Sequence, residues 1–318
     1  MSECVRVCLW LKIKGTKMSK QPFSKEILTI DPEKEVQKIT ENIRTILSKK
    51  LKRRGLVVAL SGGIDSSVTA GLVVKALGPD RVFALLMPER HSSDDTLDLS
   101  TSVADTFKVD RAHENISGIL ESLGFYKRYD DAVRQAIPDY GTGWKSKIVI
   151  PNAIENKGFN LFSIIAQAPG GTTVQKRLPL KAYLEIVAAT NFKQRTRKML
   201  EYYHADRLNY AVTGTPNRLE YDQGFFVKLG DGAADIKPIA HLYKTQVYQM
   251  AEYLGVPEKI RRRPPTTDTY SLPQGQDEFY FSLPYDRMDL CLYGKNNGYT
   301  PEQIAPTLEL TPEQIQRV

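Results

Sequence analysis

The sequence has little of what several classes of protein require. Its three cysteines, Cys4, Cys8 and Cys291, form no CxxC pair and no disulfide framework, which favours a reducing compartment, the cytoplasm. The four histidines are scattered without metal-ligand spacing, so no zinc site is expected. No apolar run reaches the roughly 20 residues of a membrane span. Residues 1–17 lack a convincing signal-peptide pattern, so no membrane association is predicted.

What the chain does have is an ordinary globular composition with a basic balance. Of its 318 residues 41% are hydrophobic, enough to bury a full core, and the net charge of +7 favours anionic partners. The basic clusters at 49–54 and 261–263 are interpreted as solvated faces at helix ends, where cations complement the negative pole of the helix. Binding of nucleotides is therefore enough to explain the positive net charge, and no nucleic-acid partner is predicted.

Apolar strands alternate with amphipathic helices along the first half of the chain. A buried strand at 56–60 leads through a glycine-containing loop into a helix that ends near residue 77, and a strand at 81–87 precedes a helix at 94–107. This βαβ order predicts an α/β fold, a doubly wound parallel sheet with flanking helices. Residues 1–30 are predicted to be an N-terminal extension that need not be ordered, and residues 31–318 a single domain.

The loop Ser61-Gly62-Gly63-Ile64-Asp65-Ser66 has the features of a phosphate site. Glycine lets the backbone approach an anion, and the following helix presents its positive pole to it. The Walker pattern GxxxxGK[ST] is absent. Bare phosphate would repel Asp65, so this carboxylate predicts a bridging Mg²⁺.

These residues carry a resemblance to a known family. The sequence SGGIDSS after an apolar strand is similar to the loop of the N-type ATP pyrophosphatases, whose adenine nucleotide alpha hydrolase-like fold is Rossmann-like. The stretches at 191–197, 214–220, 224–235, 242–247, 264–268 and 276–289 resemble the signature of the NAD synthases. The resemblance runs from about residue 32 to 295.

The resemblance implies a function and a set of site residues. It implies an ammonia-dependent ligase that uses ATP to adenylate the nicotinate carboxylate of deamido-NAD and then forms the amide. The residues implied to contact ATP are Ala59, Leu60, Ser61, Gly62, Gly63, Ile64, Asp65, Ser66, Thr215, Lys244 and Thr266. Those implied for deamido-NAD are Arg195, Lys228 and Asp235, and those for Mg²⁺ are Asp65 and Glu220. Asp65 and Lys244 are expected to be catalytic, together with Asp231 as the residue that takes a proton from ammonium.

Other expectations depend on how the chain departs from the family. The segment 125–185 is predicted to contain an insertion, with strands at 148–150 and 161–165 and a loop at 169–173 that is a candidate to close over the site. The chain stops at Val318 without the family's basic tail. No amidase domain fits before residue 32, so nitrogen is expected as free ammonia or from a separate protein. A homodimer is implied. The alternatives are a tRNA-modifying pyrophosphatase and a nucleotide-binding homologue without turnover.

Overall fold

The computed structural model describes residues 21–93, 95–150, 162–264, 269–275 and 283–318. Thr266, expected to contact ATP, lies outside these ranges. At the centre is a four-stranded sheet in the order β3-β2-β1-β7, in which every pairing is parallel. Its strands are β1 (Leu56–Ala59), β2 (Val82–Leu86), β3 (Asp110–His113) and β7 (Ala211–Thr213). The predicted α/β class is confirmed.

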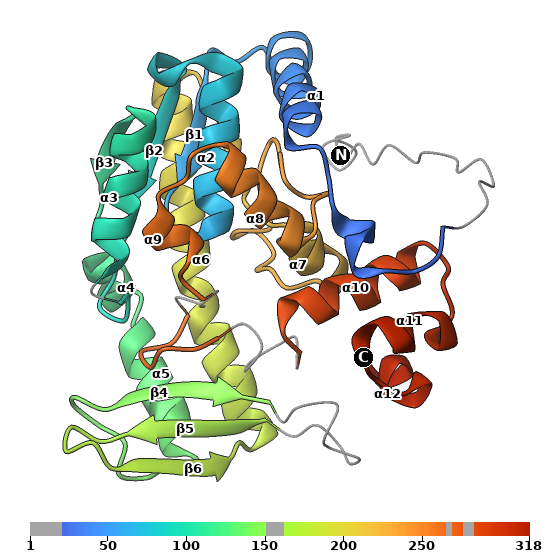
Figure 1. The fold of residues 1–318 in the computed structure, drawn as a ribbon. Coiled ribbons are helices and arrows are strands. Elements are labelled where there is room, and N and C mark those ends of the chain that lie inside the picture. The colour runs from blue at the N-terminus through green and yellow to red at the C-terminus, as the bar shows by residue number, and fades with distance from the viewer. Residues whose placement is uncertain (1–20, 94, 151–161, 265–268, 276–282) are drawn as a thin grey trace, which may run out of the picture.

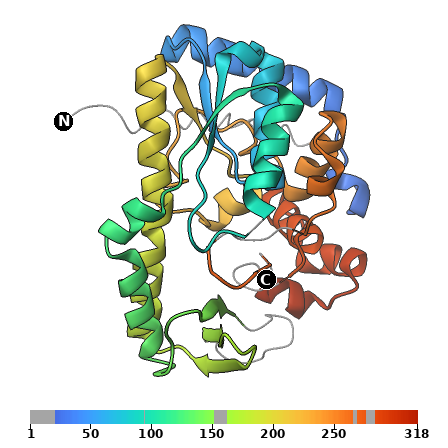
Figure 2. The ribbon, with the colours of Figure 1, turned by 90° about the vertical axis from the view of Figure 1, so that its left-hand side faces the viewer.

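Helices cover both faces of this sheet (Figures 1 and 2). Val58 on β1 faces a core formed with α1 (Pro32–Thr45), α2 (Ile64–Leu77), α3 (Asp95–Phe107) and α8 (Lys244–Tyr253). Its neighbour Val57 faces the opposite core, which includes α6 (Leu180–Leu208). Successive strand residues point to opposite faces, so a strand buried on both sides is a continuous apolar run. That is why residues 56–60 predicted a parallel strand.

Helix α1 has a capped N-terminus and leads into a basic C-terminal end. The Asp31 carboxylate accepts a hydrogen bond from the Lys34 amide at 3.2 Å, and Pro32 occupies the first turn. The helix continues into a π-helical segment, η2 (Ile46–Leu51), which has lysines in its last turn. Lys52 then adopts a left-handed conformation and ends it. The basic run at 49–54 therefore lies at a helix end.

A second, antiparallel sheet lies below the parallel one in Figure 1. It consists of β4 (Lys145–Val149), β5 (Ser163–Gln167) and β6 (Thr173–Arg177), and packs on α5 (Phe125–Arg134) and the start of α6. The strands predicted near 148–150 and 161–165 are confirmed. Residues 169–173 lie at the β5–β6 hairpin turn, where the Ala168 amide donates to the Thr172 carbonyl. That part of the chain is not among the residues that line the cavity described below. The interpretation of 125–185 as an insertion stays a prediction.

Short helices complete the fold. They are the 3₁₀ helices η1 (Lys25–Leu28) and η3 (Pro79–Arg81), and α4 (Ser117–Ser122), α7 (Arg218–Gln223), α9 (Glu258–Arg261), α10 (Tyr285–Asn296), α11 (Pro301–Leu308) and α12 (Pro312–Arg317). Helices α11 and α12 each begin with a capping box of threonine and glutamine. Part of the predicted N-terminal extension packs against this region, because Leu28 is buried beside Ile304 and Leu308. Among the described helices, none has both the length and the apolar character needed to cross a bilayer.

Candidate active site

A cavity of about 440 Å³ opens at the carboxyl edge of the parallel sheet. Its wall includes Ala59 and Leu60 at the end of β1, Met87 after β2, and Thr213 at the end of β7. Open parallel sheets bind ligands at this edge, because the loops that follow the strands diverge there. The cavity is therefore the candidate active site.

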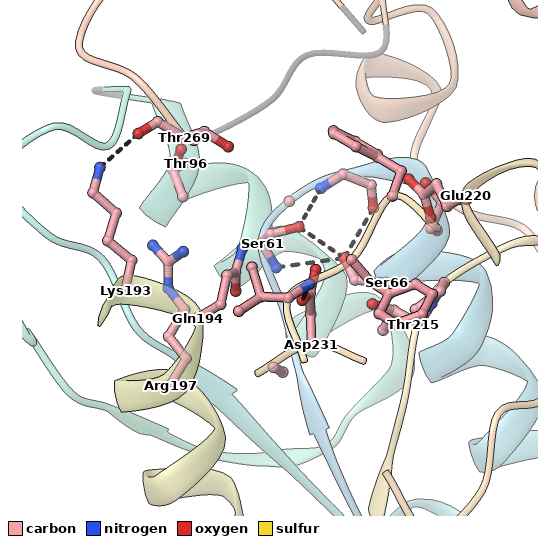
Figure 3. A pocket seen from close by; sticks show the side chains of 18 of the residues that line it. Ser61, Ser66, Thr96, Lys193, Gln194, Arg197, Thr215, Glu220, Asp231 and Thr269 are labelled. Atoms are coloured by element: carbon pink, nitrogen blue, oxygen red, sulfur yellow. Dashed lines mark hydrogen bonds between the residues drawn. The ribbon is translucent and has the colours of Figure 1, made fainter. Parts of the chain in front are cut away.

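The glycine loop forms one side of the cavity (Figure 3). Gly62 has a φ of +73°, and a Cβ at this position would lie 2.7 Å from the Leu99 Cβ, so only glycine fits. The Ser66 hydroxyl donates to the Gly63 carbonyl at 3.0 Å, and α2 begins at Ile64. All eight residues predicted from 59 to 66 line the cavity. The loop therefore lines the cavity directly, and the N-terminus of α2 follows it there.

Asp65 and Lys244, 179 positions apart, meet as an ion pair in which Lys244 is buried and Asp65 is 17% exposed. The other oxygen of Asp65 accepts a hydrogen bond from the Asn217 side chain at 3.0 Å. Asn217 also caps α7 by accepting from the Glu220 amide, while the Glu220 carboxylate accepts from the Asn217 amide. This capping box fixes Glu220 on the same side of the cavity as Asp65.

Charge is concentrated in this cluster. Burial raises the pKa of Glu220 to about 8, and the Asp65 carboxylate adds to the rise. Burial alone would lower the pKa of Lys244, but the carboxylates of Asp65 and Glu220 outweigh it and raise that pKa. Lys244 is therefore charged at neutral pH although its side chain is only 1% exposed.

Asp231 reaches the cavity from the loop after α7 (Figure 3). One of its carboxylate oxygens accepts a hydrogen bond from the Val227 amide at 2.6 Å, which fixes its direction. Burial raises its pKa, while that hydrogen bond and the charge of Lys198 oppose the rise. A carboxylate with a raised pKa is suited to accept a proton.

Three residues expected to hold deamido-NAD do not line the cavity, whereas Thr215 does. Arg195 is exposed, and its guanidinium donates to the Lys228 carbonyl at 3.3 Å. The Lys228 side chain is exposed as well. Asp235 accepts a hydrogen bond from the Val212 amide at 2.7 Å. Arg195 and Lys228 are thus neighbours on the surface, separate from the phosphate loop.

Sequence reasoning missed a row of cavity residues on α6. The row spans almost four helical turns, and its members recur every three or four positions, so they share one face. They are Val187, Thr190, Asn191, Gln194, Arg197, Lys198 and Glu201. Figure 3 shows Gln194 and Arg197 on this helix beside Lys193, whose ammonium donates to the Thr269 carbonyl at 2.8 Å. The helical spacing can be read from the sequence, but the sequence does not show that this face of α6 lines the cavity.

Comparison with known proteins identifies the family. The sequence profile described as NAD synthase matches residues 35–137 and 146–318. The chain is 57% identical over 296 residues to an NH(3)-dependent NAD(+) synthetase of Rhizobium rhizogenes, covering 93% of this chain and 89% of that one. The chain belongs to the NAD synthase family. A Thermotoga neapolitana member with the same description is 35% identical, over 89% of this chain and 91% of its own. The predicted family and the predicted class of enzyme, a ligase, are confirmed.

Solved structures support the fold of this NAD synthase family member. An NMN synthetase from Francisella tularensis superposes with a TM-score of 0.60 at 23% identity, over 88% of this chain and 94% of that one. An NH3-dependent NAD synthetase from Campylobacter jejuni gives 0.56 at 22% identity, over 91% and 96%. At these identities the likeness concerns the fold.

Aromatic and basic residues complete the wall of this NAD synthase family cavity. The Phe162 and Tyr183 rings stack at 4.2 Å, and Phe225 and Phe226 line the wall as well. The interpretation of 261–263 as a solvated helix end is wrong for Arg263, which lines the cavity and donates to the Ser93 hydroxyl at 3.2 Å. Arg263 lies two residues after the end of α9, so this contact depends on the path of the chain beyond the helix.

Proposed function

We propose that this chain catalyses the ATP-dependent amidation of deamido-NAD to NAD, with ammonia as nitrogen donor and AMP and pyrophosphate as products. The observation that carries the proposal is that one cavity joins the phosphate loop, the Asp65–Lys244 pair and Asp231. The first two suit phosphate chemistry, and the third suits the removal of a proton from ammonium. Such a combination fits adenylation followed by amidation.

Adenylation uses the charged wall of the cavity. The nicotinate carboxylate attacks the α-phosphorus of ATP, and pyrophosphate leaves with the electron pair of the broken P–O bond. Loop amides and the N-terminus of α2 hold the phosphates, and the charged Lys244 stabilises the negative charge that builds on pyrophosphate. Asn217 keeps Asp65 in place during this step through the bond at 3.0 Å.

Asp65 and Glu220 are suited to bind the magnesium ion that the proposed reaction with ATP requires. Burial of Glu220 and the charge of the Asp65 carboxylate raise the pKa of Glu220, and a divalent cation would relieve the repulsion between the two carboxylates. In the described part of the chain no group of three or more His, Cys, Asp or Glu side chains is placed to hold a metal. Mg²⁺ commonly takes one or two carboxylates and completes its shell with phosphate oxygens and water. When bound, the ion would neutralise charge on the triphosphate.

Amidation follows within the same cavity. Ammonium has no free electron pair, so it must lose a proton before its nitrogen can attack the acyl carbon. Asp231 accepts that proton, because burial raises the pKa of its carboxyl and favours the protonated form. AMP then leaves from the acyl carbon. Thr266 is assigned to ATP in this proposal on sequence grounds alone.

Arg195, Lys228 and Asp235 remain the proposed contacts of deamido-NAD, at the surface of a homodimer. The exposed surface near the first two carries large apolar side chains that a two-fold partner would cover, with Met199 59% and Leu229 71% exposed. Leu180 and Leu184 extend the apolar surface along α6 with 72% and 55% exposure. We place the enzyme in the cytoplasm, where ammonia arrives free or from a separate protein.

The decisive experiment measures ATP turnover to AMP and pyrophosphate with three additions. These are deamido-NAD with ammonium, bulk tRNA, and neither. Turnover that depends on deamido-NAD and yields NAD supports the proposal. Turnover with tRNA alone would favour the tRNA-modifying alternative, and binding of ATP without turnover under any condition would favour the non-catalytic one.

A further inference from the structure

The cavity contains a buried ion pair that the proposed mechanism does not use. The Lys198 ammonium lies 2.7 Å from a carboxylate oxygen of Glu201, and the two side chains are only 7% and 5% exposed. Both residues line the cavity, as Asp231 does. Lys198 and Glu201 lie one turn apart on α6, on the cavity face of that helix. A buried ion pair contributes little net stability compared with apolar packing, so its position calls for a chemical explanation.

The three charged groups affect one another. Burial raises the pKa of Glu201, Lys198 acts against this rise, and the charge of Asp231 adds to it. Arg197 also acts to lower it. Burial raises the pKa of Asp231, and the charge of Lys198 opposes that rise. Glu201 and Asp231 line the same cavity, and the charge of Asp231 acts on Glu201 there.

The proton balance of amidation requires more than one acceptor. Ammonium loses two protons in becoming an amide nitrogen. The first leaves before the attack, and Asp231 takes it. The second leaves once the C–N bond has formed and the bond between the acyl carbon and the bridging oxygen breaks, with AMP carrying away the electron pair. A protonated Asp231 cannot accept the second proton.

We propose that Glu201 is the second proton acceptor of the amidation step, and that Lys198 is a positioning residue that holds the Glu201 carboxylate toward the cavity. This proposal rests on the proposed function. The two carboxylates together also favour ammonium over neutral solutes, since a cation relieves their repulsion. The proton on Glu201 passes to water after the product leaves.

The test compares two nitrogen nucleophiles in the variant Glu201→Gln. Hydroxylamine is uncharged at neutral pH, so it loses one proton in forming the hydroxamate, and Asp231 is sufficient for that. Amide formation from ammonium should fall roughly 100-fold, within the usual range for a lost acid–base group, and hydroxamate formation should fall far less. Glu185→Gln is the matched control, because Glu185 lies on α6 with a side chain 46% exposed. It should leave both rates unchanged.

Adenylation is followed separately as exchange of labelled pyrophosphate into ATP that depends on deamido-NAD. An absence of exchange in the wild-type protein would overturn the proposed function itself. With exchange intact, an unchanged rate with ammonium in Glu201→Gln, or equal losses with both nucleophiles, overturns the role of Glu201. If Glu201→Gln does not fold, Lys198→Met/Glu201→Gln removes both charges of the pair. The same preference for hydroxylamine is expected there, and its absence would count against the proposal.

Discussion

Replacement of Lys244 by methionine tests how the charge cluster is held together. Lys244 is 1% exposed and pairs with Asp65, and its charge also acts on Glu220. The variant Lys244→Met keeps the length of the side chain but leaves the carboxylates of Asp65 and Glu220 without a cation. Loss of one partner of a buried pair typically costs about 3–5 kcal/mol of unfolding free energy.

The structure places the expected loss at the lower end of that range. The pKa of Glu220 is raised to about 8, so this carboxyl is already largely protonated at neutral pH, and the variant leaves mainly the Asp65 carboxylate without a cation. Asp65 is 17% exposed, so water offsets part of that loss. We expect a loss of about 3 kcal/mol at neutral pH, or roughly 4 to 5 °C in the melting temperature of a chain of this length. Ionisation of Glu220 adds a second carboxylate without a cation, so the loss of stability grows as the pH rises through about 8 and shrinks as the pH falls below it.

Urea unfolding without nucleotide measures the effect, and adenylation is assayed in parallel. The matched control is Lys34→Met, because Lys34 pairs with Asp31 at 2.9 Å but its side chain is 83% exposed. Surface pairs contribute little, so its unfolding midpoint should hardly move. The double variant Asp65→Asn/Lys244→Met should recover part of the loss. Equal midpoints for Lys244→Met and Lys34→Met would show that the buried pair does not stabilise the fold.

Four further predictions follow from the same structure. Asp65→Asn and Glu220→Gln should each impair AMP formation while circular dichroism stays unchanged, and normal adenylation in either variant would remove that residue from the phosphate site. Asp231→Asn should slow amide formation more than adenylation, so that rapid quench shows the adenylate accumulating; equal slowing of both steps would make Asp231 structural. Burial, with the charge of Lys193, lowers the pKa of His91 from 6.5 to about 4, so its stabilising contribution, up to about 3 kcal/mol, is present above pH 6.5 and lost as the pH falls toward 4. His91→Gln should flatten that acid loss in urea titrations, whereas an unchanged slope would assign it to other groups. Sedimentation at micromolar concentration should show a dimer, and a fully active monomer would contradict the dimer and its interface site.

Much of the fold could be predicted because its signals are local. The strand, loop and helix from 56 to 77 are contiguous, and apolar runs, glycine and capping residues act over a few positions. The same holds for the capping box of Asn217 and Glu220, which places Glu220 through a three-residue spacing. The family also followed from contiguous motifs, and the comparisons confirmed it.

Tertiary structure alone decided which distant groups meet. Asp65 and Lys244 become partners only because α2 and α8 pack on the same face of the sheet. The sequence pointed to Arg195, which is exposed, while Arg197 two positions later lines the cavity. Helical spacing tells which residues of α6 share a face, but not what that face meets. No role could be assigned to the Lys198–Glu201 pair from the sequence, because only the packing of α6 against the sheet places it in the cavity that Asp231 also lines.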